Sequence, residues 1–400
     1  MAGRVYYGWW VVLCSIVTLV GTLPGQTVIV SVFIPELQQS LELGPTTLSL
    51  AYMTATLTAS LPMTAVGRLS DRLGPRRVTL LVSFAMALTC FAMGSVASIL
   101  TMTVGFVGLR FFGQASMGML SGHAVALWFE AGLRRVEAVR SAAMGLATTA
   151  LPPLVHGLVA DVGWRWAYPA LGAAVLLGVL PLVALVQRDT PESMGLSLEG
   201  RKGSEAALLE GATLQEAMST PTYWVLASLG VLHASFGTAL LFHNQALAAA
   251  ASVDAQTAAW ALSGFGGASL VGTMLLFVLG NRLPLRPSLI LIPFFLSTAC
   301  VGVALARGPA LYMAAMAVLG LGMALVQASL TPAIALAFGR RHHGSIRGSV
   351  MTALVAGTAL GPVLLGLSLD LSGSFSTLLL GIPVLALTLG VAVSRVRLTG

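Results

Sequence analysis

The sequence predicts an all-α integral membrane protein whose twelve transmembrane helices form two pseudo-symmetric six-helix bundles. Three observations lead to this fold class. The 400 residues are 56% hydrophobic and only 9% charged, whereas a soluble chain carries roughly 25% charged residues. The apolar residues come in runs of roughly 20 or more, the length that a helix needs to cross the hydrocarbon core. The two halves of the chain also repeat one spaced pattern of residues.

Twelve apolar runs follow one another between short turns that carry arginine. Several runs exceed the minimum length, which a tilted helix accommodates. The first run begins soon after Arg4 with no small-residue cleavage site, so we expect a first span and not a removed signal. The predicted spans are residues 8–34, 46–67, 78–97, 99–129, 136–160, 165–187, 221–248, 256–280, 288–306, 309–338, 345–370 and 375–395.

A polar stretch from Arg188 to Thr220 divides the spans into two groups of six. We therefore predict three parts. These are an N-terminal six-helix bundle over residues 1–187, a cytoplasmic central loop over 188–220 and a C-terminal six-helix bundle over 221–400. The letters LLEGATLQEAM inside the loop are periodic and predict a short amphipathic helix on the membrane surface.

The basic residues predict the orientation. All but three of the 21 Lys and Arg residues fall on the side of the N-terminus. The exceptions are Arg110 inside a span, and Arg165 and Arg307 on the other side. Such a bias places the basic turns in the cytoplasm. We expect a multi-pass protein of the cell (inner) membrane with both termini cytoplasmic. The net charge of +7 then reflects these turns and not a nucleic-acid partner.

The second half of the chain repeats features of the first. The spacing from Phe129 to Pro153 equals that from Phe338 to Pro362. Each stretch passes from an apolar helix end through an Arg-rich turn into a helix with a proline. Transporters with internal repeats bind substrate at the interface of the two repeats. The same offset pairs Gly157 with Gly366 and Asp161 with Asp370.

A specific motif stands between the second and third spans. Residues 67–77 are GRLSDRLGPRR, with four arginines and Asp71 between two glycines. Gly74 permits a tight turn, and Asp71 at a helix end can pair with a cation or a helix N-terminus. This motif resembles the signature loop of the major facilitator superfamily. Its counterpart in the second half, GNRLPLR, has Asn281 where an acid would stand.

Four further stretches are similar to passages of the bacterial monocarboxylate and oxalate:formate porters of that superfamily. They are YYGWWVV, RDTPESMGLSLEG from Arg188, TLQEAMSTPTYWVL from Thr213 and FGRRHHGSIRG from Phe338. The resemblance covers nearly the whole chain and is more specific for the fold than for the substrate. It implies secondary active transport of a small organic anion by alternating access.

The signature loop suggests a conformational latch. We hypothesise that Asp71 holds the cytoplasmic ends of spans two and eleven together when the cavity faces outward. The latch candidates are Gly67, Asp71, Arg72, Gly74, Arg76 and Arg77.

Arg110 is the leading candidate for substrate binding. It lies about eleven residues into the fourth span, near the bilayer centre at 1.5 Å per residue. An arginine there costs at least ~2.5–3.5 kcal/mol on insertion scales, so it should face a cavity or partners. We interpret it as the group that binds or couples an anion. A structural arginine bonded to neighbouring helix ends is the alternative.

Further polar residues are candidates through the resemblance, because helices one, four, seven and ten line the central cavity in that superfamily. Polar side chains that only hold packed helices together are the alternative for each of them. A histidine could also carry a coupled proton, or be a neutral, hydrogen-bonded core residue. With Arg110, the cavity candidates are Gln114, Gln26, His233, His243, Asn244, Gln327 and Thr273.

Two departures from the porters bear on the substrate. Where many of them carry an arginine in helix eight, this chain has Thr273, and where oxalate exchange uses a lysine in helix eleven, it has Ala356. A dicarboxylate is therefore disfavoured, a monocarboxylate is the first choice and a neutral solute stays open. No acid lies deep in a span, so any proton coupling would use a histidine or the substrate's own carboxylate.

Other function classes lack their residues. We find no clustered carboxylates, metal-ligand spacing or activated nucleophile and no nucleotide fingerprint, so we predict no enzyme, no cofactor and no metal. Cys14, Cys90 and Cys300 lie inside apolar runs and imply no disulfide framework. The alternatives to anion transport are an exporter of neutral or lipophilic molecules and a non-transporting membrane sensor. Substrate, direction, coupling ion and oligomeric state stay open.

Overall fold

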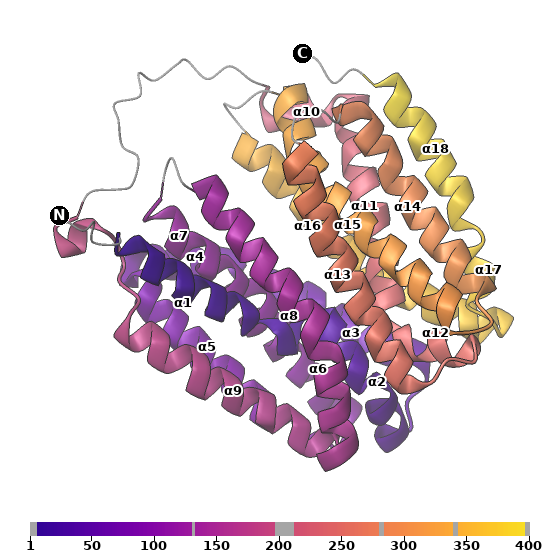
Figure 1. The fold of residues 1–400 in the computed structure, drawn as a ribbon, viewed down its shortest axis with the longest axis horizontal. Helices are drawn as coiled ribbons and strands as arrows, with labels where there is room; N and C mark the ends of the chain where they lie inside the picture. The colour runs from indigo at the N-terminus through magenta and orange to yellow at the C-terminus, as the bar shows by residue number, and fades with distance from the viewer. Residues whose placement is uncertain (1–5, 130–132, 197–211, 280–283, 339–342, 397–400) are drawn as a thin grey trace. The chain divides into compact units, whose positions relative to one another are not determined.

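A computed structural model of the chain describes residues 6–129, 133–196, 212–279, 284–338 and 343–396. Its regular elements are helices, with no strand among the described residues (Figure 1). The chain divides into two compact units. Unit 1 comprises residues 1–36 and 54–205, and unit 2 comprises residues 37–53 and 206–400.

Unit 1 contains the first six predicted spans except residues 46–53 of the second. Three of these spans are interrupted, the first by a short 3-10 turn, the second by a turn at residues 61–62 and the fourth by a π-helical segment. Its elements are α1 (Gly8–Val20), η1 (Leu23–Gly25), the start of α2 (Thr27–Leu41), the end of α3 (Pro45–Ser60), α4 (Met63–Leu73), α5 (Pro75–Met93), α6 (Ile99–Gly108), η2 (Leu109–Met117), α7 (Gly118–Ala126), α8 (Leu133–Val162), α9 (Trp164–Leu185) and η3 (Glu192–Met194).

Unit 2 contains the last six predicted spans together with the first part of α3. The predicted bounds of the two bundles, at residues 187 and 220, stay a prediction. The two compact units do not follow these bounds, because residues 37–53 group with unit 2. The elements after the central stretch are α10 (Leu214–Met218), α11 (Pro221–Phe242), α12 (Asn244–Ala250), α13 (Ala255–Leu279), α14 (Leu285–Leu305), α15 (Pro309–Phe338), α16 (His343–Ser372), α17 (Ser376–Leu379) and α18 (Ile382–Arg395).

Each of the twelve predicted spans coincides with helices in the described residues. Ten stretches are long and apolar enough to cross a membrane by length and composition. The other two predicted spans, 46–67 and 99–129, are each built from shorter helices. The break in the former is the turn between α3 and α4, and the break in the latter is the π-helical segment η2. The all-helical prediction is confirmed.

The repeated pattern forms two long helices of equal length. α8 and α16 each have 30 residues, with prolines at 152 and 153 in α8 and at 362 in α16. A proline inside a helix removes one backbone hydrogen bond and bends the helix. The shared spacing in the sequence therefore places a proline in the corresponding part of both helices.

The aromatic opening of the chain anchors α1 within unit 1. The Tyr6 hydroxyl donates to the carbonyl of Trp128 at 3.1 Å, and the Tyr7 hydroxyl donates to that of Val186 at 2.7 Å. Val11 and Val12 of α1 are buried against Trp128 in the same apolar cluster. Tyrosine suits this place because its ring is apolar and its hydroxyl reaches a carbonyl.

Only part of the predicted surface helix lies in the described residues. α10 is five residues long. Thr213 and Glu216 form a capping box, in which each side chain accepts a hydrogen bond from the other residue's backbone N–H. The letters LLEG of the predicted segment fall within 197–211, outside the described residues.

Candidate functional site

The first span is broken at its middle. α1 ends at Val20, the turn η1 follows, and α2 begins at Thr27. The local cause is the sequence GTLPGQ. Pro24 has no backbone N–H, and glycine disfavours a continuous helix. A β-carbon at Gly25 would lie 2.1 Å from the carbonyl oxygen of Leu109. Glycine at this position therefore lets the break lie directly against the fourth span.

The fourth span is irregular at the same place. η2 (Leu109–Met117) is π-helical, a conformation that is rare and concentrated at functional sites. Gly113 brings this segment close to its neighbours, because a β-carbon there would lie 2.8 Å from the Met86 side chain and 3.4 Å from the Thr22 carbonyl oxygen. The junction of η1 and η2 thus joins two irregular backbone segments inside unit 1.

Arg110 lies at this junction and is 3% exposed. Its Nη1 donates to the Gly25 carbonyl at 3.4 Å and to the Thr27 hydroxyl oxygen at 3.5 Å. Both distances are long compared with the ~2.7–2.9 Å of a charge-assisted hydrogen bond. Because Thr27 opens α2, the positive end of that helix dipole lies at the same place. Arg110 is therefore buried at a place where its own charge and the N-terminus of α2 would both stabilise a negative group.

Two glutamines complete the junction. Nε2 of Gln26 donates to the Thr22 hydroxyl at 3.2 Å. Oε1 of Gln114 is buried and has no hydrogen-bond partner among the described residues. The backbone nitrogen of Gln114 would be 3.4 Å from a β-carbon on Gly25, so η1 and η2 are in close contact here. Unit 1 therefore brings together three of the candidates, Arg110, Gln114 and Gln26.

The candidates at the end of α11 hold helices of unit 2 together. Nε2 of His243 lies 2.9 Å from the Pro362 carbonyl oxygen and 3.3 Å from the Ser49 hydroxyl. Nδ2 of Asn244 donates to the Ala258 carbonyl at 3.0 Å, and the Tyr312 hydroxyl donates to Oδ1 of Asn244 at 2.8 Å. These bonds favour the alternative interpretation, in which both side chains connect packed helices.

The other three candidates of unit 2 differ from one another. His233 is 1% exposed, and neither of its ring nitrogens has a hydrogen-bond partner among the described residues. Gln327 on α15 is exposed. The Thr273 hydroxyl donates to the Ser269 carbonyl of its own helix at 2.8 Å. Within the described part of the chain, the structure does not bring these three side chains together.

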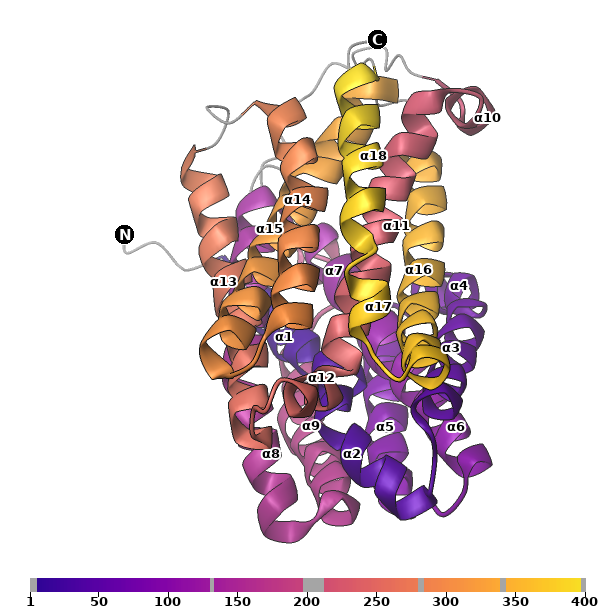
Figure 2. The same cartoon turned by 90° about the vertical axis from the view of Figure 1, so that its right-hand side faces the viewer.

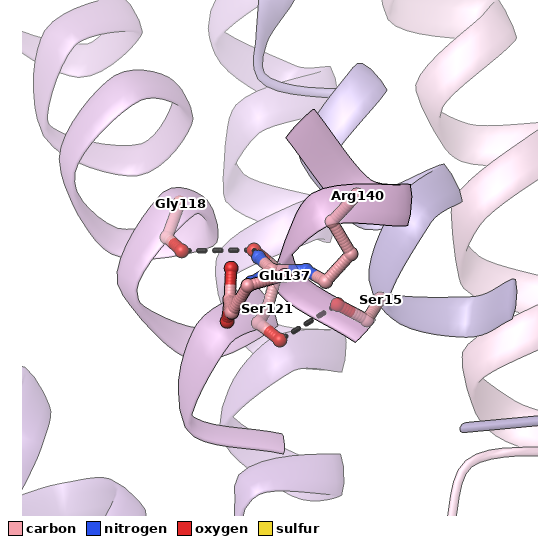
Figure 3. A network of polar contacts seen from close by, with 5 residues as sticks. All are labelled: Ser15, Gly118, Ser121, Glu137 and Arg140. Carbon is pink, nitrogen blue, oxygen red and sulfur yellow. Dashed lines mark hydrogen bonds and ion pairs between the residues drawn. The ribbon is translucent and has the colours of Figure 1, made fainter. Parts of the chain in front are cut away.

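A second buried arginine was not predicted from the sequence. Arg140 on α8 is 5% exposed. Its Nη1 donates to Oε1 of Glu137 at 2.5 Å, and its Nη2 donates to the Ser121 hydroxyl at 2.7 Å. The Ser15 hydroxyl of α1 donates to the Ser121 carbonyl at 2.7 Å, and Figure 3 shows the whole network. Arg140 thus links α8 to α7 and, through Ser121, to α1. The spacing of Glu137 and Arg140 on one helix face was the available signal.

Replacement of Arg140 is expected to destabilise unit 1. In Arg140→Gln the charge-assisted bond to Ser121 is lost, which costs about 1.5–3 kcal/mol. The pair with Glu137 adds little, because that carboxylate is half exposed. Thermal unfolding of the purified protein measures the effect. Arg72→Gln is the matched control, since Arg72 is exposed on α4. Equal melting temperatures for the two variants would contradict this role.

The signature loop is connected to the start of the central stretch. Gly74 has φ +85°, and a β-carbon there would lie 2.7 Å from the Asp189 carboxylate. That carboxylate accepts a hydrogen bond from the backbone N–H of Arg76 at 2.8 Å, at the N-terminus of α5. The Arg76 side chain also donates to the Ala184 carbonyl. Asp189 therefore caps α5, a role that the sequence did not indicate.

The proposed latch lies only partly in the described residues. The surroundings of Gly67 and the side chain of Asp71 are not described. Arg72 and Arg77 are exposed. Nearby, the Ser70 hydroxyl is 3.1 Å from Nδ1 of His123. The function of Asp71 as a latch stays a prediction.

Comparison with known proteins gives a consistent picture. The model of the Major Facilitator Superfamily matches residues 15–245. Over 169 residues the chain is 28% identical to the "Probable sulfoacetate transporter SauU" of Cupriavidus necator. That stretch covers 41% of this chain and 38% of the relative.

The fold matches that of solved structures. A bacterial homologue of the human lysosomal transporter Spinster is similar in its inward-facing, unoccupied form with a TM-score of 0.71 and 14% identity. Its occupied form gives a TM-score of 0.72 and 15% identity. Each match covers 98% of this chain and 95% of the other. At these identities the likeness concerns the fold, and it confirms the predicted fold class.

Proposed function

Because the chain belongs to the Major Facilitator Superfamily, whose model matches more than half of it, we propose that it moves a small organic anion across the membrane by alternating access. Monocarboxylates are the first substrate class to test. Transport itself follows from the family and the fold, which are those of transporters and not of enzymes. What we propose is that the substrate is a small organic anion, that it is of the monocarboxylate class and that its transport is coupled to protons.

The observation that carries the proposal is Arg110 at the junction of two irregular segments. Half-helix ends at a break in a membrane span are typical substrate sites in transporters. The N-terminus of α2 carries a partial positive charge, and a guanidinium can donate two parallel hydrogen bonds to one carboxylate. A buried arginine is costly in a membrane, and a bound anion offsets that cost.

Gln114 adds hydrogen-bonding capacity to the same site. Its amide has an unpartnered buried oxygen among the described residues, and an amide presents either donors or an acceptor, depending on its orientation. A carboxylate with an α-hydroxyl would use both Arg110 and Gln114. The relative from Cupriavidus necator is named for sulfoacetate, which carries a carboxylate and a sulfonate. This name supports an organic anion and adds sulfonates to the compounds to test.

The competing proposal is an exporter of neutral or lipophilic molecules. A groove of about 1050 Å³ in unit 2 lies along α14, α15 and α18, and its lining is almost entirely aliphatic and aromatic. Figure 2 shows α14 and α18 side by side. Such a groove suits an apolar molecule or a lipid chain. Its described lining residues include three hydroxyl side chains, Ser297, Thr298 and Ser394, but no charged side chain, so it lacks a cation for an anion.

A binding screen separates the two proposals. Purified protein is warmed with monocarboxylates, sulfonates, dicarboxylates, amino acids or lipophilic cations, and its melting temperature is recorded. A ligand that binds only the native state raises that temperature. Stabilisation by small monocarboxylates or sulfonates supports the anion proposal. Stabilisation by lipophilic compounds alone would replace it with the exporter.

The proposed topology in the cell membrane has its own test. With both termini cytoplasmic, a cysteine introduced at the exposed Ser193 should resist a membrane-impermeant thiol reagent in intact cells. A cysteine at the exposed Ser252 should react, because it lies in an outer turn. The three native cysteines are buried, so the background is low. Ready labelling at position 193 in intact cells would overturn the orientation.

A further inference from the structure

His233 occupies an unusual place within unit 2. The side chain lies on α11 beside α15, where a β-carbon on Gly322 would be 3.0 Å from its Cε1. One turn further along α11, a β-carbon on Gly237 would be 3.9 Å from its Nε2. Phe295 of α14 borders the same space. Glycine at position 322 therefore leaves room for the imidazole, whereas a β-carbon at position 237 would only make an ordinary van der Waals contact with it.

Among the described residues, the imidazole of His233 has no hydrogen-bond partner at either ring nitrogen in this conformation. It is 1% exposed. A buried polar group without a partner costs free energy, and native structures contain few of them. A leucine would fill this space without that cost. The histidine is therefore better explained by a state in which its nitrogens are used.

Charged groups on the helices around His233 do not contact it. α11 carries none between residues 221 and 242, and α15 carries none. Among the described side chains, the charged groups on the other neighbouring helices are Arg286 at the start of α14, Asp370 near the end of α16 and Arg395 at the end of α18. An imidazolium would thus be buried without a counter-charge, so this conformation holds the neutral ring.

We infer that His233 is the proton-binding site of the transport cycle. This inference rests on the proposed anion transport. The neutral ring takes up one proton from the aqueous phase on the side where substrate enters, and the anion then binds to the protonated form. On the other side the proton and the anion leave, which restores the neutral, buried ring of the present conformation. One anion and one proton then cross together, with no net charge moved.

The structure distinguishes His233 from His243. Nε2 of His243 is already bonded to the Pro362 carbonyl, so that histidine connects α11 to α16. His233→Leu should raise the melting temperature of the protein, because it removes an unsatisfied buried group. His243→Leu should lower it, because the Pro362 bond is lost. A lower melting temperature for His233→Leu would contradict the unsatisfied state from which the inference starts.

Proton binding can be observed without a substrate. In ¹⁵N-histidine-labelled protein in liposomes, nuclear magnetic resonance separates neutral from charged imidazole. One signal, absent in His233→Gln, should change to the charged form on acidification. If that signal stays neutral until the protein unfolds, His233 is a packing residue and the inference fails.

Coupling is measured in liposomes with the best anion from the binding screen. For one proton per anion, a gradient of one pH unit supports about tenfold accumulation. His233→Gln should lose this accumulation and keep exchange of labelled for unlabelled anion, whereas His243→Gln should keep the ratio of the two activities. If His233→Gln still accumulates the anion, the proton travels on the substrate's own carboxylate. If the wild-type protein neither binds nor transports an anion, the proposed function fails.

Discussion

Arg110→Ala is expected to abolish anion binding in a protein that still folds. The guanidinium donates at least two charge-assisted hydrogen bonds to the proposed carboxylate, each worth about 1.5–3 kcal/mol. Since 1.4 kcal/mol is about tenfold in affinity, the dissociation constant should rise by about two orders of magnitude or more. Titration of the purified variant with the best anion from the screen measures this change.

Arg110→Lys should give an intermediate result. Lysine keeps the charge but lacks the planar fork that bonds a carboxylate through two parallel N–H groups. Arg395→Ala is the matched control, because Arg395 is exposed at the end of α18. Wild-type affinity in a folded Arg110→Ala protein would favour a neutral solute. Poor folding of both Arg110 variants, with unchanged intrinsic affinity, would make the arginine structural.

Gly25→Ala is expected to disrupt the site without changing any polar side chain. A β-carbon there would lie 2.1 Å from the Leu109 carbonyl oxygen, which is backbone and cannot rotate away. Either η1 or η2 must move. Overpacking of this kind costs about 1–3 kcal/mol, and Arg110 would lose its position against Gly25 and Thr27. We expect a lower melting temperature together with loss of anion transport.

Gly118→Ala is the control for that experiment. Gly118 follows η2 directly, and a β-carbon there would have no described atom of another residue within 4 Å. Alanine at this position should therefore leave the melting temperature and transport nearly unchanged. If Gly25→Ala behaved like Gly118→Ala, the close approach of the two segments would not matter for the site. If both variants failed, the whole π-helical region would be intolerant of change.

The candidate site was only partly predictable from the sequence. Arg110 stands out because a charge in an apolar run is costly wherever the chain folds. Gln114 follows it by four residues and so shares its helix face. The sequence also suggested His243 and Asn244 as cavity residues, and it did not distinguish them from His233. The hydrogen-bond partners of His243 and Asn244 lie on other helices, α13, α15 and α16.

Composition and charge alone predicted a membrane protein and its spans, and the signature loop with four further stretches carried the resemblance to a transporter family. These properties depend on local averages, since the bilayer selects any run of apolar residues that is long enough. The proline and glycines of GTLPGQ already disfavour a continuous helix, and the tertiary structure decided that this break lies directly against Leu109 of the fourth span. It also decided that Arg140 is buried and that His233 lacks a partner among the described residues. Burial and hydrogen bonding depend on which distant segments meet, and that information is absent from local hydropathy.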